Sequence, residues 1–331
     1  MSLSDAAVRH LKGVLGKPDA PGGRYEIRGV VGEGGMGTVY RALDRALDRE
    51  VALKVLRADL AAPEAEGRLR REARILGRLE HPGIVPVHDV GTLADGRVFY
   101  VMKLVRGDRL ESYLRSASLT DTLRLFLRVC ETVGFAHAHG VVHRDLKPSN
   151  IMVGPFGEVL VLDWGIARLI HPEGDSHPTP AEPAVSDGGS DAPATAEDEP
   201  DTSPGTVLGT PGFMAPEQAQ GWMQLVGPRS DVFALGAILR FLVGGAGAGA
   251  PPRSLVSIWS KAMRAEPEGT YVSAAELGAE ITRFLDGAPV AAHRESVAER
   301  AGRVFRRYQT AIILVLTYLS IRLLFLALRG L

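Results

Sequence analysis

Apolar positions follow a strand-like pattern in the first third of the chain. Tyr25, Ile27 and Val31 lie on alternate positions of an extended segment, so one face of it is apolar. The other segments with a strand pattern, rich in β-branched and aromatic residues, are 38–40, 51–53, 84–90 and 97–105. These runs predict a β-rich unit over residues 24–106.

A helical spacing appears once within this unit and dominates after residue 107. Leu69, Leu76 and Leu79 are separated by seven and three positions, which predicts a helix over 65–79. The other predicted helices are 109–115, 120–139, 231–243, 254–265 and 273–285. Strands followed by helices indicate an α+β, bilobal fold, with a β-rich lobe at 24–106 and a helical lobe at 107–287. Residues 1–23 are predicted to be a short helix and a linker.

The formal net charge of −1 conceals an acidic segment inside the helical lobe. Residues 171–205 contain nine acidic residues, seven prolines and no Lys or Arg, and Val185 is their only large apolar side chain. Such a segment cannot bury enough apolar surface to offset the entropy lost on ordering. We therefore expect 171–205 to be a disordered acidic insertion.

The C-terminal part of the sequence is basic and then apolar. Residues 288–309 include Arg303, Arg306 and Arg307, and 310–328 is an apolar stretch interrupted only by Arg322. This stretch of 19 mostly apolar residues is about the length that a transmembrane helix needs, and the preceding arginines favour a cytoplasmic flank. We expect a single-pass membrane anchor with the folded lobes in the cytoplasm. The alternative is a buried or interfacial helix, which the charge of Arg322 favours.

A glycine-rich run lies between the first two predicted strands. Its residues are Gly32, Glu33, Gly34, Gly35, Met36 and Gly37. Glycines allow backbone N–H groups to approach phosphates closely, but an inert hairpin would have the same composition. A strand follows the run, whereas a dinucleotide-binding loop would lead into a helix.

One lysine and one glutamate follow this run at positions that suggest an ion pair. Lys54 ends the run Val51-Ala52-Leu53-Lys54, and Glu72 lies beside the apolar stripe of the 65–79 helix. A carboxylate next to a buried stripe needs a partner, and Lys54 is the natural one. Alternatively, Lys54 is a solvated strand end and Glu72 an ordinary residue at the edge of the core.

The most specific segment is the eight-residue run from His143 to Asn150. It reads His143-Arg144-Asp145-Leu146-Lys147-Pro148-Ser149-Asn150, and Asp163-Trp164-Gly165, Gly209-Thr210-Pro211 and Ala215-Pro216-Glu217 follow it in order. With the glycine run, Lys54 and Glu72, this series resembles the eukaryotic-like (Hanks-type) serine/threonine protein kinases of bacteria over residues 25–285.

The resemblance implies a phosphotransferase that uses ATP and Mg²⁺. Lys54 would hold the α- and β-phosphates with Glu72 positioning it, Asp145 would accept or orient the substrate hydroxyl, and Lys147 would stabilise the γ-phosphoryl group. Asn150 and Asp163 would bind Mg²⁺ through oxygen atoms. Thr210 would support Asp145 and Lys147.

The resemblance also implies an adenine pocket next to the glycine run. Its expected residues are Val31, Val39, Ala52, Met102, Lys103 and Val105, in addition to the glycine run itself. Lys103 replaces the usual acidic residue of the hinge, and Trp164 replaces the usual phenylalanine after the metal-binding aspartate.

The segment between Asp163 and Glu217 is long because it contains the acidic insertion. We expect it to be an activation loop, with Thr202, Ser203 and Thr206 as candidate phosphosites, although an unregulated tether is the alternative.

The sequence departs from the family pattern in two further places. Thr270 stands where the family has an arginine that pairs with Glu217, so either another arginine substitutes or Glu217 is less buried. The helical lobe is abbreviated after its central helix at 231–243, which puts the docking of substrates in question.

The expected function is therefore an ATP-dependent serine/threonine protein kinase. Its expected partners are protein substrates, a membrane and a second copy for trans-autophosphorylation, and we expect no nucleic-acid partner. The alternatives are a catalytically weak pseudokinase that acts as a membrane scaffold and a small-molecule phosphotransferase of related fold.

Overall fold

The chain is described by a computed structural model. The residues that it describes are 23–34, 37–57, 63–115, 117–164, 168–169, 212–245, 250–296, 299–302, 309–310 and 313–322. The predicted helix before residue 23 and the acidic insertion at 171–205 lie outside these residues.

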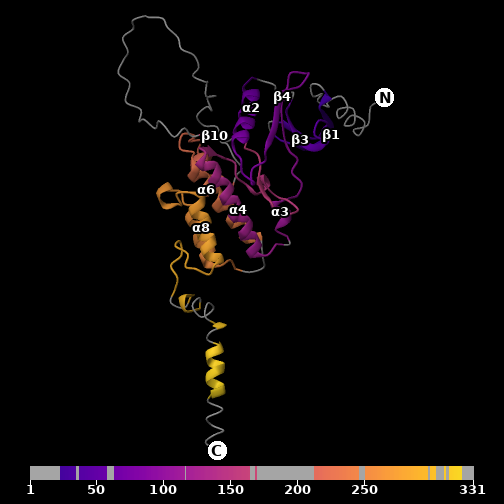
Figure 1. Cartoon of the computed structure of the whole chain (residues 1–331). Helices are drawn as coiled ribbons and strands as arrows, with labels where there is room; N and C mark the ends of the chain where they lie inside the picture. The colour runs from indigo at the N-terminus through magenta and orange to yellow at the C-terminus, as the bar shows by residue number, and fades with distance from the viewer. Residues whose placement is uncertain are drawn as a thin grey trace, which may run out of the picture.

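The N-terminal lobe is a five-stranded antiparallel sheet with one helix packed against it (Figure 1). Its strands are β1 (Tyr25–Glu33), β2 (Gly37–Asp44), β3 (Arg49–Leu56), β4 (Val87–Thr92) and β5 (Val98–Lys103), and the helix is α2 (Pro63–Arg78). The spatial order is β1-β2-β3-β5-β4, which places β3 at the centre. The β-rich lobe expected from the sequence is thus present.

Strand β3 supplies a different set of side chains to each face of this sheet. Val51, Leu53 and Val55 belong to a small apolar cluster on one face. Because side chains alternate along a strand, Lys54 and Leu56 face the opposite way, where Leu56 joins the main core together with Leu69 of α2. Lys54 is therefore presented to the side of the sheet on which α2 packs.

The C-terminal lobe is mainly helical. Its helices are α3 (Leu110–Tyr113), α4 (Leu119–Ala138), α5 (Pro216–Ala219), α6 (Pro228–Gly245), α7 (Arg253–Ala262) and α8 (Ala274–Leu285), and two 3₁₀ turns are η3 (Pro148–Asn150) and η4 (Pro267–Gly269). Short strands complete it: β6 (Asp108–Arg109), β7 (Val141–Val142), β8 (Ile151–Val153), β9 (Val159–Val161) and β10 (Arg168–Leu169).

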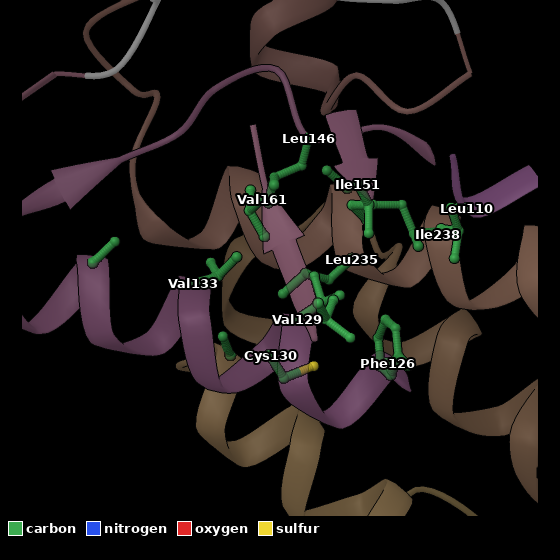
Figure 2. Close-up of a cluster of buried hydrophobic side chains, with 14 of the residues drawn as sticks. Leu110, Phe126, Val129, Cys130, Val133, Leu146, Ile151, Val161, Leu235 and Ile238 are labelled. Atoms are coloured by element: carbon green, nitrogen blue, oxygen red, sulfur yellow. The ribbon is translucent and has the colours of Figure 1, made fainter. Parts of the chain in front are cut away.

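Figure 2 shows the core of this lobe, where apolar side chains of α4 and α6 meet those next to β8 and β9. Phe126 and Val129 of α4 pack there with Leu235 and Ile238 of α6, and Leu146 lies at the top of the same cluster. The apolar core therefore holds the segment 143–150 in place through Leu146. α4 begins after Ser118, whose hydroxyl accepts a hydrogen bond from the Asp121 N–H at 3.2 Å.

The long helices lie within a few residues of their predicted bounds, whereas the predicted strand at 84–90 is displaced. Strand β4 begins at Val87, and Ile84 instead forms an isolated bridge to Val161 of β9. Ile84 and Val161 are both in the main core, so this bridge joins the two lobes. An apolar run does not reveal from the sequence which of two elements it pairs with.

The connection that follows the central helix of the helical lobe is short. Helix α6 ends at Gly245 and α7 begins at Arg253, and both pack in the same core through Leu239, Leu255 and Ile258.

The predicted transmembrane segment at 310–328 is described only in part. Residues 313–322 are helical and exposed along their length. Among the residues that the structure describes, no helix is both long enough and apolar enough to cross a membrane.

Candidate active site

A buried ion pair joins the sheet to helix α2. Lys54 Nζ of β3 donates hydrogen bonds to Glu72 Oε1 at 2.8 Å and to Oε2 at 3.0 Å. The hydroxyl of Tyr100, the residue opposite Lys54 on β5, donates to the same Oε1 at 2.8 Å. The Glu72 side chain is only 1% exposed, so these donors supply the partners that a buried carboxylate requires. The pair predicted from the sequence is confirmed, and Tyr100 is an additional partner.

The Lys54 ammonium also faces Asp163 of the C-terminal lobe. Nζ lies 3.6 Å from Asp163 Oδ1, and the Asp163 side chain remains 56% exposed. Burial alone would lower the pKa of Lys54, but the charges of Glu72 and Asp163 outweigh it and raise that pKa above its ordinary value. Burial and the Glu72 charge also raise the pKa of Tyr100. Lys54 is therefore a permanent cation between the two lobes.

The second group of predicted residues lies together after strand β7. Lys147 Nζ donates to Asp145 Oδ2 at 2.7 Å, and Asn150 Nδ2 donates to the Asp145 carbonyl oxygen at 2.9 Å. Asn150 ends the 3₁₀ turn η3, and its own carbonyl accepts the Leu162 N–H at 2.7 Å. This last bond ties the Asp145 loop to the segment that ends at Asp163. The structure thus brings Asp145, Lys147, Asn150 and Asp163 to one region.

Two side chains of the helical lobe hold Arg144 of this loop in an unfavourable backbone conformation. Arg144 has a φ of 70°, in the left-handed region that costs a non-glycine residue about 1–3 kcal/mol. Its N–H donates to Asp231 Oδ1 at 2.9 Å, and its carbonyl accepts from Gln218 Nε2 at 2.6 Å. Asp231 Oδ2 also accepts the His143 N–H at 2.8 Å. Asp163 is the other loop residue of the site with a positive φ, at 61°.

The geometry of Asp231 and Gln218 was not anticipated from the sequence. Asp231 begins the predicted 231–243 helix, and a lone carboxylate at the start of an apolar helix is the signal that could have pointed to a buried role. Its third partner is His137 Nε2 of α4 at 2.8 Å. Burial would raise the pKa of Asp231, but the hydrogen bond from His137 and the other donors lower it instead.

The side chains of His143 and Trp164 pack against each other next to Asp145. His143 Nε2 donates to the Leu162 carbonyl at 3.0 Å and its Nδ1 accepts the Asp145 N–H at 3.3 Å, so the neutral tautomer with the proton on Nε2 fits both partners. The Trp164 ring packs against His143 with centroids 4.6 Å apart, and its Nε1–H donates to the Val161 carbonyl at 3.1 Å. The indole is therefore buried and satisfied.

Three of the residues expected around adenine, Val39, Ala52 and Met102, share one face of the sheet. Val39 is opposite Lys54 in the β2–β3 register, and Ala52 is opposite Met102 in the β3–β5 register. Val31 lies near the end of β1 and is exposed, and Gly32 pairs with Val39. Lys103 is exposed at the end of β5, and Val105 is half-buried in the connection to the second lobe.

Part of the predicted glycine run is visible as a hairpin turn. Gly34 N–H donates to the Gly37 carbonyl at 2.9 Å, and Glu33 ends β1. Several predicted site residues lie outside the described part of the chain: Gly35, Met36, Thr210 and the candidate phosphosites Thr202, Ser203 and Thr206.

Gly37 is the position of this hairpin that cannot hold a side chain. A Cβ there would lie 2.6 Å from the Val55 carbonyl oxygen of β3. We predict that Gly37→Ala lowers the free energy of unfolding by about 1–3 kcal/mol, because the two strands must move apart. Urea unfolding measures the loss. Gly29→Ala is the matched control, since no atom lies within 4 Å of a Cβ at Gly29, and equal unfolding midpoints for the two variants would contradict the prediction.

Glu217, whose usual arginine is missing, has a hydroxyl partner. The Ser230 hydroxyl, buried at the start of α6, donates to Glu217 Oε1 in a short hydrogen bond and accepts the Gly227 N–H at 3.1 Å. Thr270 instead donates to the Ala262 carbonyl at 3.0 Å. Glu217 is half-buried rather than buried, which settles the alternative left open by the sequence.

We predict that Ser230→Ala destabilises the protein by about 1–2 kcal/mol, since the Gly227 N–H and the Glu217 carboxylate both lose a partner. Ser112→Ala is the control, because Ser112 is exposed on the short helix α3. Thermal unfolding followed by circular dichroism compares them. A drop no larger than that of Ser112→Ala would show that Ser230 does not take the place of the arginine.

The β-sheet lobe contains a buried lysine–glutamate pair, and the helical lobe carries the clamped Asp145–Asn150 loop. This is the arrangement expected of the two-lobed protein kinase fold. The model of the protein kinase domain family matches residues 25–248. The chain belongs to this family.

Curated relatives agree with this assignment. The chain is 32% identical over 307 residues to the serine/threonine-protein kinase PknD of Protochlamydia amoebophila, covering 80% of this chain and 30% of the relative. It is 35% identical over 306 residues to PknD of Chlamydia felis, covering 80% and 31%. It is 40% identical over 232 residues to PknD of Chlamydia trachomatis, covering 65% and 24%. The chain thus spans less than a third of the length of these relatives.

Proposed function

We propose that the chain is an ATP-dependent serine/threonine protein kinase. The observation that carries this proposal is the Lys54 ammonium held between Glu72 and Asp163, since it fixes a cation where the two lobes meet. Lys147 two residues after Asp145, and relatives named as serine/threonine kinases, support Ser and Thr as the acceptors.

The reaction that these residues would perform is a direct phosphoryl transfer. The oxygen of the acceptor hydroxyl bonds to the γ-phosphorus while the bond to the bridging oxygen breaks, and ADP leaves. Asp145 takes the hydroxyl proton, and Lys147, 2.7 Å from Asp145 Oδ2, offsets negative charge beside the transferred group. Lys54 neutralises the phosphates that remain with ADP.

The oxygen ligands present fit Mg²⁺, which would neutralise the charge of the phosphates. Kinase magnesium sites use one or two protein oxygens and complete the shell with phosphate and water. Asp163 is exposed on the side of Lys54, and the Asn150 amide nitrogen is occupied by Asp145, which leaves its oxygen as the available ligand atom. Asp163 and Asn150 would therefore hold the ion.

The nucleotide would lie against the face of the sheet that carries Lys54. Val31, Val39, Ala52 and Met102 would enclose adenine, and the backbone of Lys103 and Val105 would bind its edge. The backbone of the glycine run at 32–37 would cover the phosphates, and Thr210 would support Asp145 and Lys147.

Labelled-ATP transfer with phosphoamino-acid analysis tests the proposal. The full chain with Mg²⁺ should label itself and a generic protein on Ser or Thr, and Lys54→Met should abolish the label. Labelled small molecules without labelled protein would favour a small-molecule phosphotransferase. ATP binding without any transfer would favour a scaffold, the reading to which the abbreviated lobe between Gly245 and Arg253 lends support.

We also propose autophosphorylation at Thr202, Ser203 or Thr206, aided by a second copy in trans. Their position shortly before Gly209-Thr210-Pro211 supports the choice. Phosphopeptide mapping of active protein should find at least one of them occupied, and occupancy of other sites alone would refute it.

We further propose that 310–328 anchors the chain in a membrane, with 288–309 as its basic cytoplasmic flank. The exposed apolar side chains of 313–322 and the flanking arginines support this. The chain should stay with membranes after alkaline carbonate extraction, and its release into the soluble fraction would overturn the proposal.

A further inference from the structure

The outer face of helix α2 carries a row of arginines. Arg71, Arg74 and Arg78 are spaced three and four positions apart, so they share one side of the helix. All three are exposed, and they lie opposite the face that buries Leu69 and Ala73. We call these three residues the α2 arginine face.

None of the ion pairs among the described residues involves the α2 arginine face. No acidic side chain of the described part lies within 4.0 Å of the three guanidinium groups, whereas Arg24 and Arg45, which flank strands of the sheet, are paired. Like charges three or four positions apart on a helix repel one another. An anionic partner would therefore stabilise α2, and this helix carries Glu72 on its buried side.

The same chain contains a segment of complementary charge. Residues 171–205 carry nine acidic residues and no Lys or Arg. They belong to a stretch of 42 residues between Leu169 of β10 and Gly212, both of which the structure describes. That stretch has a contour of about 140 Å when extended, whereas α2 is about 24 Å long, so its length does not prevent contact. A tethered segment is also present at an effective concentration in the millimolar range.

We propose that the α2 arginine face binds the acidic segment 171–205 of the same chain. A second copy is a poorer occupant for a symmetric contact, because two arginine faces would repel. The contact acts on the outside of the helix whose inner side holds Glu72 against Lys54, so it would stabilise the position of that pair. It does not depend on phosphoryl transfer.

Zero-length carbodiimide coupling in the full chain tests this contact. The variant Arg74→Lys keeps the charge and adds an amine to a chain that has only six lysines, so new products are readily assigned. We expect its coupling to carboxylates of 171–205 to exceed that of the control Arg124→Lys, an exposed position on α4, by at least about tenfold. Raising NaCl to 0.5 M should remove the excess, since the contact is electrostatic.

A mixture of isotopically light and heavy chains identifies the occupant. We expect cross-linked products in which the two joined segments are both light or both heavy. Equal coupling in Arg74→Lys and Arg124→Lys would overturn the proposal, and so would salt-independent coupling. Products that predominantly join light to heavy chains would show a partner in trans, and loss of coupling on addition of a DNA oligonucleotide but not of salt would point to a nucleic acid instead.

Discussion

The variant Asp145→Asn should lose phosphoryl transfer by a factor of about 10²–10⁴ while it retains ATP binding. The amide has the shape of the carboxylate but cannot take up the proton of the acceptor hydroxyl. Lys147 and Asn150 both donate to this side chain or its backbone, so the loop keeps its position in the variant. Initial rates of label transfer and fluorescent-nucleotide titration measure the two properties.

Asp95→Asn is the matched control for this substitution. Asp95 lies in an exposed turn, where its carboxylate pairs with Arg97, and this pair is remote in sequence from both catalytic segments. Its variant should transfer phosphate at the wild-type rate. A wild-type rate in Asp145→Asn would mean that Asp145 is not the base, and a parallel loss of ATP binding would mean that the loop has collapsed.

The second large effect is expected on stability, at Asp231. Its carboxylate accepts the His143 N–H at 2.8 Å, the Arg144 N–H at 2.9 Å and the His137 Nε2–H at 2.8 Å. In Asp231→Asn one oxygen becomes an NH₂ group that faces a donor, so at least one buried donor is left unpaired. We predict a loss of about 3–5 kcal/mol in the free energy of unfolding, together with a loss of transfer activity because Arg144 is no longer clamped.

The pH dependence separates this role from a simple loss of packing. The native environment lowers the pKa of Asp231 below its ordinary value of 3.8. A lowered native pKa contributes stability above the unfolded pKa, and that contribution is lost as the pH falls through the native pKa. The difference between wild type and Asp231→Asn should therefore be constant from pH 6 to 8 and shrink only below about pH 4. Asp286→Asn, at the exposed end of α8, should match wild type throughout; the same loss in both variants, or a difference that shrinks near neutral pH, would contradict the role of Asp231.

The sequence reveals the part of the site that depends on local pattern. Glu72 next to an apolar helical stripe required a cation, and Lys54, which lies within β3, met that requirement. The run from His143 to Asn150 is contiguous, so the cluster of Asp145, Lys147 and Asn150 followed from one short segment.

The residues that hold the 143–150 loop in place could not be predicted from a local sequence pattern. Gln218 binds the carbonyl of Arg144 from 74 residues away, and Asp231 binds the His143 N–H from 88 residues away. These bonds join a side chain to a backbone group, and any polar residue of suitable length would give the same sequence pattern. Ser230 is a further example, since a hydroxyl replaces the expected guanidinium as the partner of Glu217.

One measurement tests the kinase assignment most directly: ATP binding and γ-phosphoryl transfer determined side by side on the full chain with Mg²⁺, for wild type, Lys54→Met and Asp145→Asn. We predict transfer to protein Ser or Thr in wild type, weakened ATP binding with no transfer in Lys54→Met, and intact binding with transfer reduced by a factor of about 10²–10⁴ in Asp145→Asn. Wild-type protein that binds ATP but transfers no more phosphate than either variant would contradict the assignment.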